Sequence, residues 1–215
     1  LLVKLTEVSQ DIDLAVGSFS TSADFLKRPV ERDMVRVMRP VDLVAETLYQ
    51  RGAVHAAWGK LYRRSLFENR LFTEGLYYED LDFFYRYCLA CRSTAVTDAP
   101  LYFYRQQPGS IMHTWKPRRL DVLKITKAIE EYMATSYPEL ERAAADRRLS
   151  ANFNIFILAS ANGQPDVADE CWEIVRQYRW RSFTDKRVRF KNKAGILLSY
   201  LGKNTFKKIS RWVGV

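Results

Sequence analysis

The stretch YYEDLDFFYRYCLACR, residues 77–92, is the most informative part of this sequence. Its apolar residues Leu81, Phe84, Cys88 and Cys91 recur every three or four positions, which is the spacing of side chains on one face of an α-helix. The pattern predicts a helix that begins near the two acidic residues of the stretch and buries this apolar face.

Apolar runs on both sides of this helix predict strands. Residues 13–19 form a short apolar run that indicates a buried strand, and residues 20–40 are polar and irregular enough to form a surface excursion. Residues 95–97 and 101–104 predict two further strands, separated by the sequence Asp-Ala-Pro that ends at Pro100. Strands mixed with helices indicate an α/β fold.

Further helices are predicted before and after these strands. Residues 41–50 place apolar side chains on one face, with Gly52 in the position of a C-terminal cap, and a short helix is expected at residues 64–68. Three longer helices are predicted at about 120–136, 139–161 and 166–180, with Pro138 and Pro165 at the breaks. The second half of the chain is therefore expected to be a helical appendage.

The net charge of +9 is distributed unevenly. Residues 176–215 contain 12 Lys or Arg and one Asp, whereas residues 1–175 contain 22 Lys or Arg and 24 Asp or Glu. We therefore expect an α/β part, a helical appendage and a basic amphipathic tail, at residues 1–117, 118–182 and 183–215. The nearly neutral body argues against nucleic acid as a partner.

The basic tail has two interpretations. Apolar residues such as Leu197, Leu201 and Phe206 form two short faces that are surrounded by lysines, as in a helix that lies on an anionic membrane surface. The other interpretation is a C-terminal helix that covers the body of the protein and leaves its basic face in water. The sequence favours neither.

Cysteine content and hydropathy indicate a cytoplasmic protein. Cys88, Cys91 and Cys171 are too few and too unevenly placed for a disulfide framework, and we expect them to pack in the core. The longest uncharged stretch, residues 149–165, contains too many polar residues to span a bilayer. The first ten residues, which start at Leu1, do not resemble a signal peptide, so we expect a cytoplasmic segment of a longer protein, peripheral on the inner membrane face if the tail docks there.

Glu79 and Asp80 are the strongest candidates for chemistry. Two carboxylates at the start of a helix face unpaired backbone amides and the positive end of the helix dipole, which favours their ionised form. An ionised carboxylate can accept a proton as a general base. Taken alone, such a pair more often does no more than cap and neutralise the helix.

A wider pattern contains this pair. Five blocks occur in order along the chain, at residues 57–67, 71–75, 78–80, 100–105 and 109–112. They read AWGKLYRRSLF, LFTEG, YED, PLYFYR and GSIM. This succession resembles family-2 glycosyltransferases that build capsular, exopolysaccharide and teichoic-acid-like glycans, over roughly residues 10–125.

The resemblance implies a GT-A fold, the fold of many nucleotide-diphospho-sugar transferases, and an inverting mechanism. An acceptor hydroxyl of a glycan or lipid-linked acceptor would attack a nucleotide-activated sugar, with Asp80 as the general base and Glu79 as an acceptor-binding residue. Arg105 and Ser110 match positions that face the leaving diphosphate. Trp58 would line the acceptor site, although it could instead fill the core beneath it.

The resemblance covers only the acceptor side of such an enzyme. The uridine site and the Asp-x-Asp metal motif of the family are not visible, so we expect the donor-binding half to be absent from this chain and the isolated chain to be inactive. Mg²⁺ or Mn²⁺ would act in the intact enzyme, but none would be bound here. Two sequences have the letters of this motif, Asp11-Ile12-Asp13 and Asp80-Leu81-Asp82, but the first precedes its apolar run instead of ending it, and the second lies inside the predicted helix.

The two histidines are weak candidates for a site, and one alternative function remains open. His113 follows Ser110 closely and could reach a metal, but a lone histidine is more often structural, and His55 receives no role. The rival is a non-catalytic binding or structural module whose basic tail contacts a membrane or nucleic acid.

Overall fold

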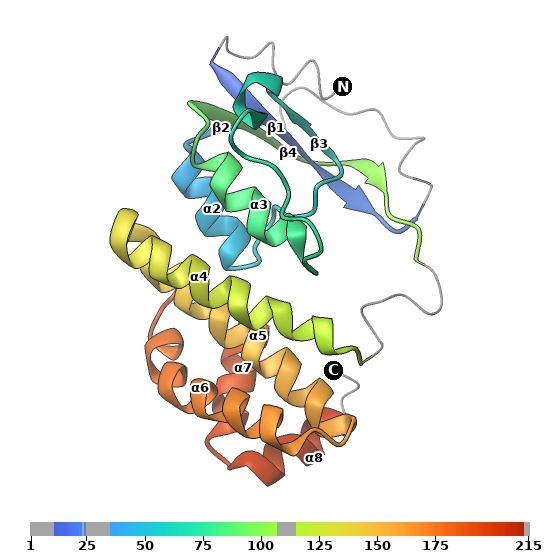
Figure 1. The fold of residues 1–215 in the computed structure, drawn as a ribbon, viewed down its shortest axis with the longest axis vertical. Coiled ribbons are helices and arrows are strands. Elements are labelled where there is room, and N and C mark those ends of the chain that lie inside the picture. The colour runs from blue at the N-terminus through green and yellow to red at the C-terminus, as the bar shows by residue number, and fades with distance from the viewer. Residues whose placement is uncertain (1–10, 23, 25–34, 107–114, 213–215) are drawn as a thin grey trace. The chain divides into compact units, whose positions relative to one another are not determined.

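The computed structural model describes residues 11–22, 24, 35–106 and 115–212 (Figure 1). The chain divides into two compact units, residues 1–114 and 115–215. The division falls three residues before the end of the first part expected from the sequence.

The first unit is built on a four-stranded mixed sheet. Its strands are β1 (Ile12–Ser20), β2 (Val35–Met38), β3 (Lys60–Tyr62) and β4 (Ser93–Phe103). They are ordered β2-β4-β1-β3, with β1 and β4 parallel and the two outer strands antiparallel to their neighbours. The strand expected at 13–19 is confirmed as β1, whereas β2 lies within the stretch that the sequence had suggested to be a surface excursion.

Strand β4 corrects a second expectation. The two strands predicted on either side of Pro100 are one continuous strand. Its register against β1 shifts from Val16 opposite Val96 to Ser18 opposite Pro100. The extra residues of β4 form a bulge there. Gly17 lies at this point of β1, and a Cβ atom on it would lie 2.6 Å from Leu101 Cδ1, so a side chain at this position would displace Leu101.

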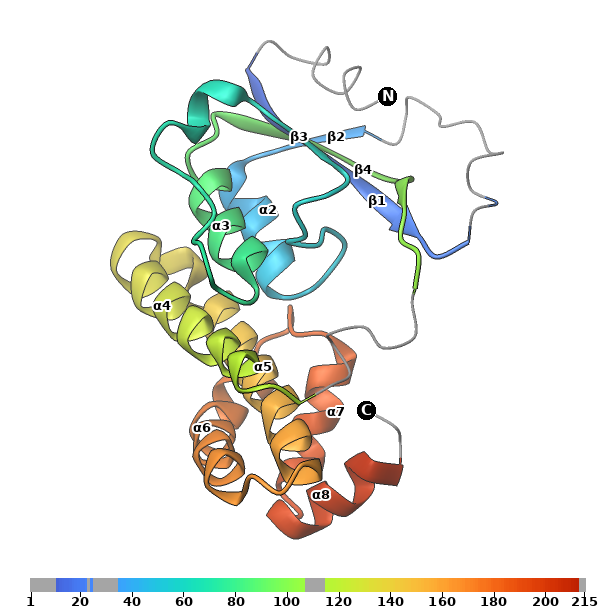
Figure 2. The ribbon, with the colours of Figure 1, turned by 45° about the vertical axis from the view of Figure 1, so that its right-hand side comes forward.

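Two helices cover one face of this sheet, α2 (Pro40–Leu48) and α3 (Glu79–Cys88) (Figures 1 and 2). The predicted apolar face of α3 is confirmed, since Leu81, Phe84 and Cys88 are almost wholly buried. Helix α2 has its C-terminal cap at Tyr49, followed by Gln50 with φ 55°; Gly52, with φ 72°, lies two residues farther on and is not the capping residue. The amide of Arg51 donates to the Glu46 carbonyl across this turn at 2.8 Å, which closes the helix.

The second unit consists of helices, as the sequence predicted (Figure 2). Its α-helices are α4 (Asp121–Ser136), α5 (Glu141–Ala161), α6 (Pro165–Phe183), α7 (Phe190–Ser199) and α8 (Lys203–Trp212). Short 3-10 helices occur at Arg64–Phe67 in the first unit and at Pro117–Leu120 and Pro138–Leu140 in the second. Helix α5 packs against both α4 and α6.

The basic tail is folded into this unit. Helix α8 buries Phe206 to 4% exposure in a cluster of rings with Phe153, Phe156 and Trp172, at centroid distances of 5.2–5.7 Å. Lys203 forms an ion pair with Asp169 of α6. The tail therefore covers part of its own unit while most of its lysines keep contact with water.

Within the described part of the chain, no helix is both long enough and apolar enough to cross a membrane. Cys88, Cys91 and Cys171 are free and buried, as expected for core residues.

Candidate functional site

Asp80 lies in the first turn of α3, two residues after a residue with a strained backbone. Tyr78 precedes the helix with φ 63° and ψ 34°, a left-handed conformation that is unusual for a bulky side chain. Asp80 Oδ1 accepts a hydrogen bond of 2.8 Å from the amide of Leu81, and its side chain is 27% exposed. Glu79 beside it is exposed. Both carboxylates thus occupy the first turn of the helix, and Asp80 is partly sheltered while still open to solvent.

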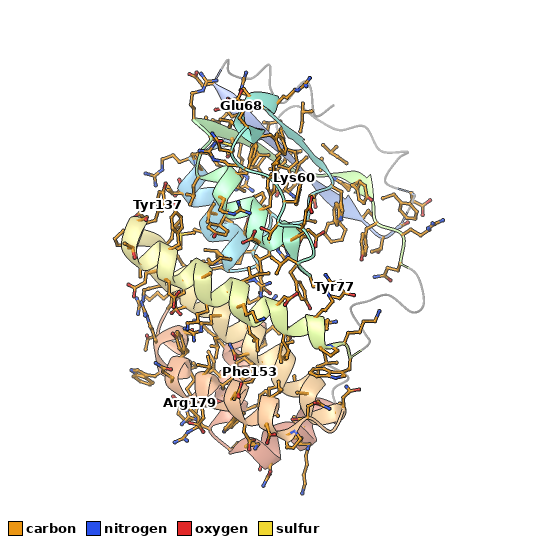
Figure 3. All side chains as sticks on the ribbon, in the orientation of Figure 1. Lys60, Glu68, Tyr77, Tyr137, Phe153 and Arg179 are labelled. Carbon is orange, nitrogen blue, oxygen red and sulfur yellow. The ribbon has the colours of Figure 1, made fainter. Side chains whose placement is uncertain are left out.

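Two basic side chains lie beside Asp80. His55 Nε2 is 3.9 Å from Asp80 Oδ1, which forms an ion pair when the imidazole is protonated. Lys60, at the start of β3, donates from Nζ to the Ala56 carbonyl at 2.5 Å and lies 5.3 Å from the centre of the Phe84 ring (Figure 3). Burial lowers the pKa of Lys60 to about 8, against the opposing effect of the negative charge of Asp80. The ammonium is therefore still mostly protonated at neutral pH.

Four aromatic side chains contact one another in the same unit, and we call them the aromatic surface: Phe19, Trp58, Tyr102 and Tyr104. The indole of Trp58 stacks on Tyr102 at 4.4 Å and on Tyr104 at 5.4 Å between ring centres. Phe19 meets Trp58 edge-on at 5.3 Å and is 38% exposed. Trp58 is half-buried, so it belongs to a partly open surface rather than to the fully buried core.

The loop of residues 54–59 carries one residue beside Asp80 and one residue of the aromatic surface. It carries His55 at one end and Trp58 near the other, and Gly59, with φ 68°, leads into β3. The amide of Gly17 donates to the Gly59 carbonyl at 3.0 Å, which fixes the loop against β1. The aromatic residues of β1 and β4 come from the carboxyl ends of two parallel strands, the edge at which open α/β sheets bind ligands.

The residues expected to face a diphosphate are placed only in part. Arg105 is exposed and lies two residues beyond the end of β4, next to Tyr104, whose amide donates to the Ser20 carbonyl at 2.9 Å. Arg105 is therefore at the same edge of the sheet as the aromatic surface. Ser110 and His113 lie outside the described residues.

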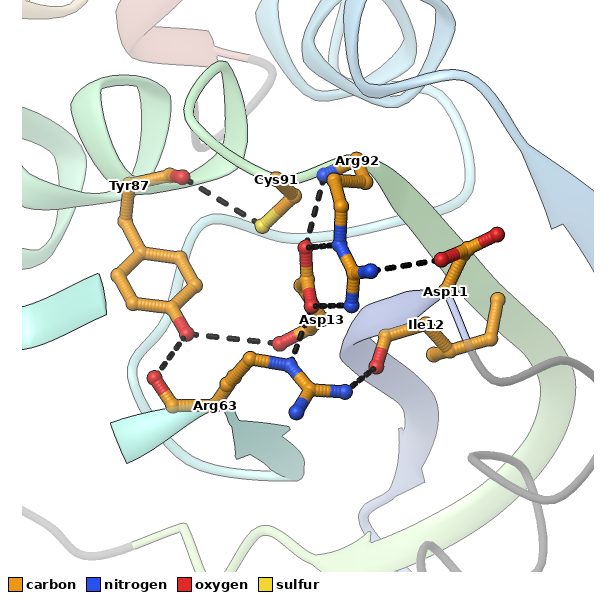
Figure 4. Close-up of polar contacts among 7 residues, drawn as sticks. All are labelled: Asp11, Ile12, Asp13, Arg63, Tyr87, Cys91 and Arg92. Carbon is orange, nitrogen blue, oxygen red and sulfur yellow. Dashed lines mark hydrogen bonds and ion pairs between the residues drawn. The ribbon is translucent and has the colours of Figure 1, made fainter. Parts of the chain in front are cut away.

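The carboxylates of the two Asp-x-Asp sequences have other partners. Asp13 is 3% exposed and accepts hydrogen bonds from the Arg92 amide at 2.9 Å, from the Arg92 guanidinium at 2.9 and 3.1 Å, and from Arg63 Nε (Figure 4). Asp82 pairs with Arg86 Nη2 at 2.5 Å and accepts from Thr73 at 2.7 Å. Among the described residues no three His, Cys, Asp or Glu side chains gather to hold a metal.

Sequence reasoning missed the two basic neighbours of Asp80. His55 lies in an irregular loop with no partner nearby in sequence. Lys60 is part of the block at residues 57–67, and nothing in its local sequence indicates that it lies near Asp80. Both are brought to Asp80 by the pairing of β3 with β1 and by the packing of α3 below the sheet, as the register of Lys60 opposite Val16 shows. Only tertiary structure carries that information.

No protein-family model matches this sequence, and no curated protein matches it. The functional interpretation therefore depends on the residues of the site.

Proposed function

We propose that this chain is the acceptor-side part of an inverting glycosyltransferase of GT-A type, with Asp80 as the general base. The observation that carries the proposal is the position of Asp80, which is partly exposed at the start of α3 and lies 3.9 Å from His55, three residues before Trp58 of the aromatic surface. The strain at Tyr78 adds support, since strained backbone is concentrated at functional sites.

In the proposed reaction Asp80 accepts the proton of an acceptor hydroxyl as the hydroxyl oxygen attacks the anomeric carbon of the donor sugar. The bond between that carbon and the diphosphate oxygen breaks, the diphosphate leaves with the electron pair, and the configuration inverts. Lys60 provides a positive charge near Asp80 that offsets its negative charge before the proton is taken. The nucleoside of the donor and any metal would be held by residues other than those described here.

The aromatic surface and Arg105 would position the substrates. Rings such as Trp58 and Tyr102 offer apolar faces against which the C–H groups of a saccharide can pack, and the exposed edge of Phe19 extends this surface. The Arg105 guanidinium, at the same edge of the sheet, is suited to a phosphate oxygen. Glu79, exposed beside Asp80, would bind a second acceptor hydroxyl.

The test uses the protein as its gene encodes it and measures release of nucleoside diphosphate from uridine and guanosine diphosphate sugars, with Mn²⁺ and saccharide acceptors. Asp80→Asn should lower the turnover rate by about 10² to 10⁴, the range for loss of a general base. Asp98→Asn is the matched control, because Asp98 is an exposed carboxylate on β4 of the same unit.

Two results would refute the proposal: no diphosphate release from any donor, or an Asp80→Asn rate within threefold of the wild-type rate. Saccharide binding that is unchanged in Asp80→Asn, together with no transfer by either protein, would instead identify a non-catalytic binding module. Thermal unfolding of both variants verifies that the fold is intact.

A further inference from the structure

A cavity of about 490 Å³ lies within the second unit, between α5, α7 and α8. Its walls are mostly apolar and include Phe153, Ile157, Gly195, Leu198, Phe206 and Ile209. Phe153 is labelled in Figure 3. The volume is within the usual range of small-molecule sites, and a cavity with walls of this kind is suited to a hydrocarbon group.

Basic and polar side chains also line this cavity. Arg189 is held in place by donating from Nε to Asn192 Oδ1 at 3.0 Å and from Nη2 to Ser150 Oγ at 3.1 Å. Lys191 lines the cavity and is exposed to water. A ligand that fits this arrangement has an apolar body and an anionic end.

Helix α7, which lines the cavity, also carries exposed apolar side chains. Phe190, a lining residue, is 86% exposed; Leu197 of the same helix and Leu201, just after it, are outside the lining and are 55% and 60% exposed. Residues 183–215 contain nine Lys or Arg and one Asp. Exposed apolar side chains among many cationic ones favour the interface of an anionic bilayer.

We propose that this cavity takes up one hydrocarbon chain of an anionic membrane phospholipid, with its phosphate held by Lys191 and Arg189. The apolar walls bury the chain, and the two cations compensate the charge of the phosphate. The exposed Phe190, Leu197 and Leu201 enter the surrounding lipid. This inference does not rest on the proposed transfer reaction, because all of its residues belong to the second unit.

The test titrates the 215-residue chain with 1-palmitoyl-lysophosphatidylglycerol below its micelle concentration, followed by calorimetry. Lysophosphatidylcholine with the same chain is the comparison ligand, since it carries no net charge. We expect saturable binding of the anionic lipid, at least tenfold tighter than that of the zwitterionic lipid. A tenfold difference corresponds to about 1.4 kcal/mol.

Gly195→Leu is designed to fill the cavity without harming the fold. A Cβ atom on Gly195 would lie 3.6 Å from the Phe153 ring, which is an ordinary contact, and the longer leucine side chain would extend into the space that the lipid chain needs. Leucine also has a higher helix propensity than glycine. We expect binding at least tenfold weaker, with an unfolding temperature equal to or above that of the wild type.

Lys191→Glu tests the phosphate contact, and Lys186→Glu is its matched control. Lys186 is an exposed lysine outside the cavity lining, so both variants change the net charge equally. Lys191→Glu should weaken binding of the anionic lipid more than Lys186→Glu does.

The proposal is overturned if the wild type does not bind the lipid at 1 mM, if Gly195→Leu binds it as well as the wild type, or if the two lysine variants behave alike. Ala194→Leu replaces Gly195→Leu if circular dichroism shows that the latter does not fold.

Discussion

Asp13→Asn should destabilise the first unit more than any change at a neighbouring surface carboxylate. The Asp13 carboxylate is buried at the start of β1 and accepts hydrogen bonds from Arg63 on one side and from the backbone and side chain of Arg92 on the other (Figure 4). It therefore links three segments that lie 50 and 79 residues apart in sequence. Asparagine has a similar shape, but it loses the negative charge and presents an amide N–H₂ group to a guanidinium.

The size of the effect follows from the exposure of the three partners. Breaking a buried ion pair by removing one member costs about 3–5 kcal/mol when the remaining charge stays buried. Here the Arg63 and Arg92 side chains are 43% and 56% exposed, so both guanidinium groups can regain water. We expect a loss of about 2–3 kcal/mol in the free energy of unfolding, or a fall of about 10 °C in the unfolding temperature of the first unit.

The assay is urea unfolding followed by circular dichroism, with Asp11→Asn as the matched control. Asp11 also pairs with Arg92, at 2.6 Å, but its side chain is 65% exposed, and such a pair contributes about 0–1 kcal/mol. Equal stability of the two variants would show that the buried network does not hold the sheet together.

The same network predicts a dependence on pH. Burial alone would raise the pKa of Asp13, but the hydrogen bonds from Arg92 and Arg63 outweigh it, so the pKa lies below its ordinary value. The stabilisation is therefore present above pH 4 and is lost as the pH falls through the lowered pKa of the folded state. Asp13→Asn should show a shallower loss of stability on acidification, and parallel curves for the two proteins would contradict this assignment.

Two further predictions concern buried titratable groups. Burial raises the pKa of Asp146 to about 6 despite hydrogen bonds from Asn192, so the carboxyl stabilises the second unit below pH 4 and this contribution, about 3 kcal/mol, is lost as the pH rises to 6. Asp146→Asn should therefore flatten the loss between pH 4 and 6 in urea unfolding, and an unchanged slope would contradict this. Burial also raises the pKa of Cys91 and of Cys171 to about 12 and that of Cys88 well above its ordinary value. Iodoacetamide at pH 8 should label all three thiols only in urea, by mass spectrometry, and rapid labelling of the native protein would show that they are accessible.

Elements with a strong internal pattern could be predicted from the sequence. The regular apolar spacing in α3 and the proline breaks around α5 and α6 depend only on neighbouring residues, and these helices agree with the structure. Strand β1 was recognisable for the same reason, because most of its residues form one apolar run. In the structure six successive residues from Ile12 are buried.

Strand β2 was missed and strand β4 was divided in two, because tertiary pairing decides both strands. In the sequence, Pro100 indicates a strand break, since proline has no backbone N–H to donate to a neighbouring strand. In the described residues, β2 pairs with β4 only as far as Thr97, so Pro100 lies where β4 has β1 as its sole neighbour. Strand β2 consists of four residues with exposed Arg36 and Val37, too few to form a recognisable alternation.

The candidate site divides in the same way. Glu79 and Asp80 stand at a helix start that the sequence could locate, but the approach of His55 and Lys60 depends on how the loop of residues 54–59 packs. The aromatic surface joins Phe19 to residues more than 80 positions away in sequence. Such long-range neighbours have no local signal.

The parallel pairing of β1 with β4 has a consequence for how the protein is made. When β1 leaves the ribosome, its partner strands lie about 40 and 80 residues farther along the chain, so both of its edges stay unpaired while that length is synthesised. The helices of the second unit, in contrast, find partners among sequence neighbours, and such local contacts form much faster. The first unit is therefore expected to fold more slowly than the second, and β1 is the segment that most needs protection by a chaperone in the interval.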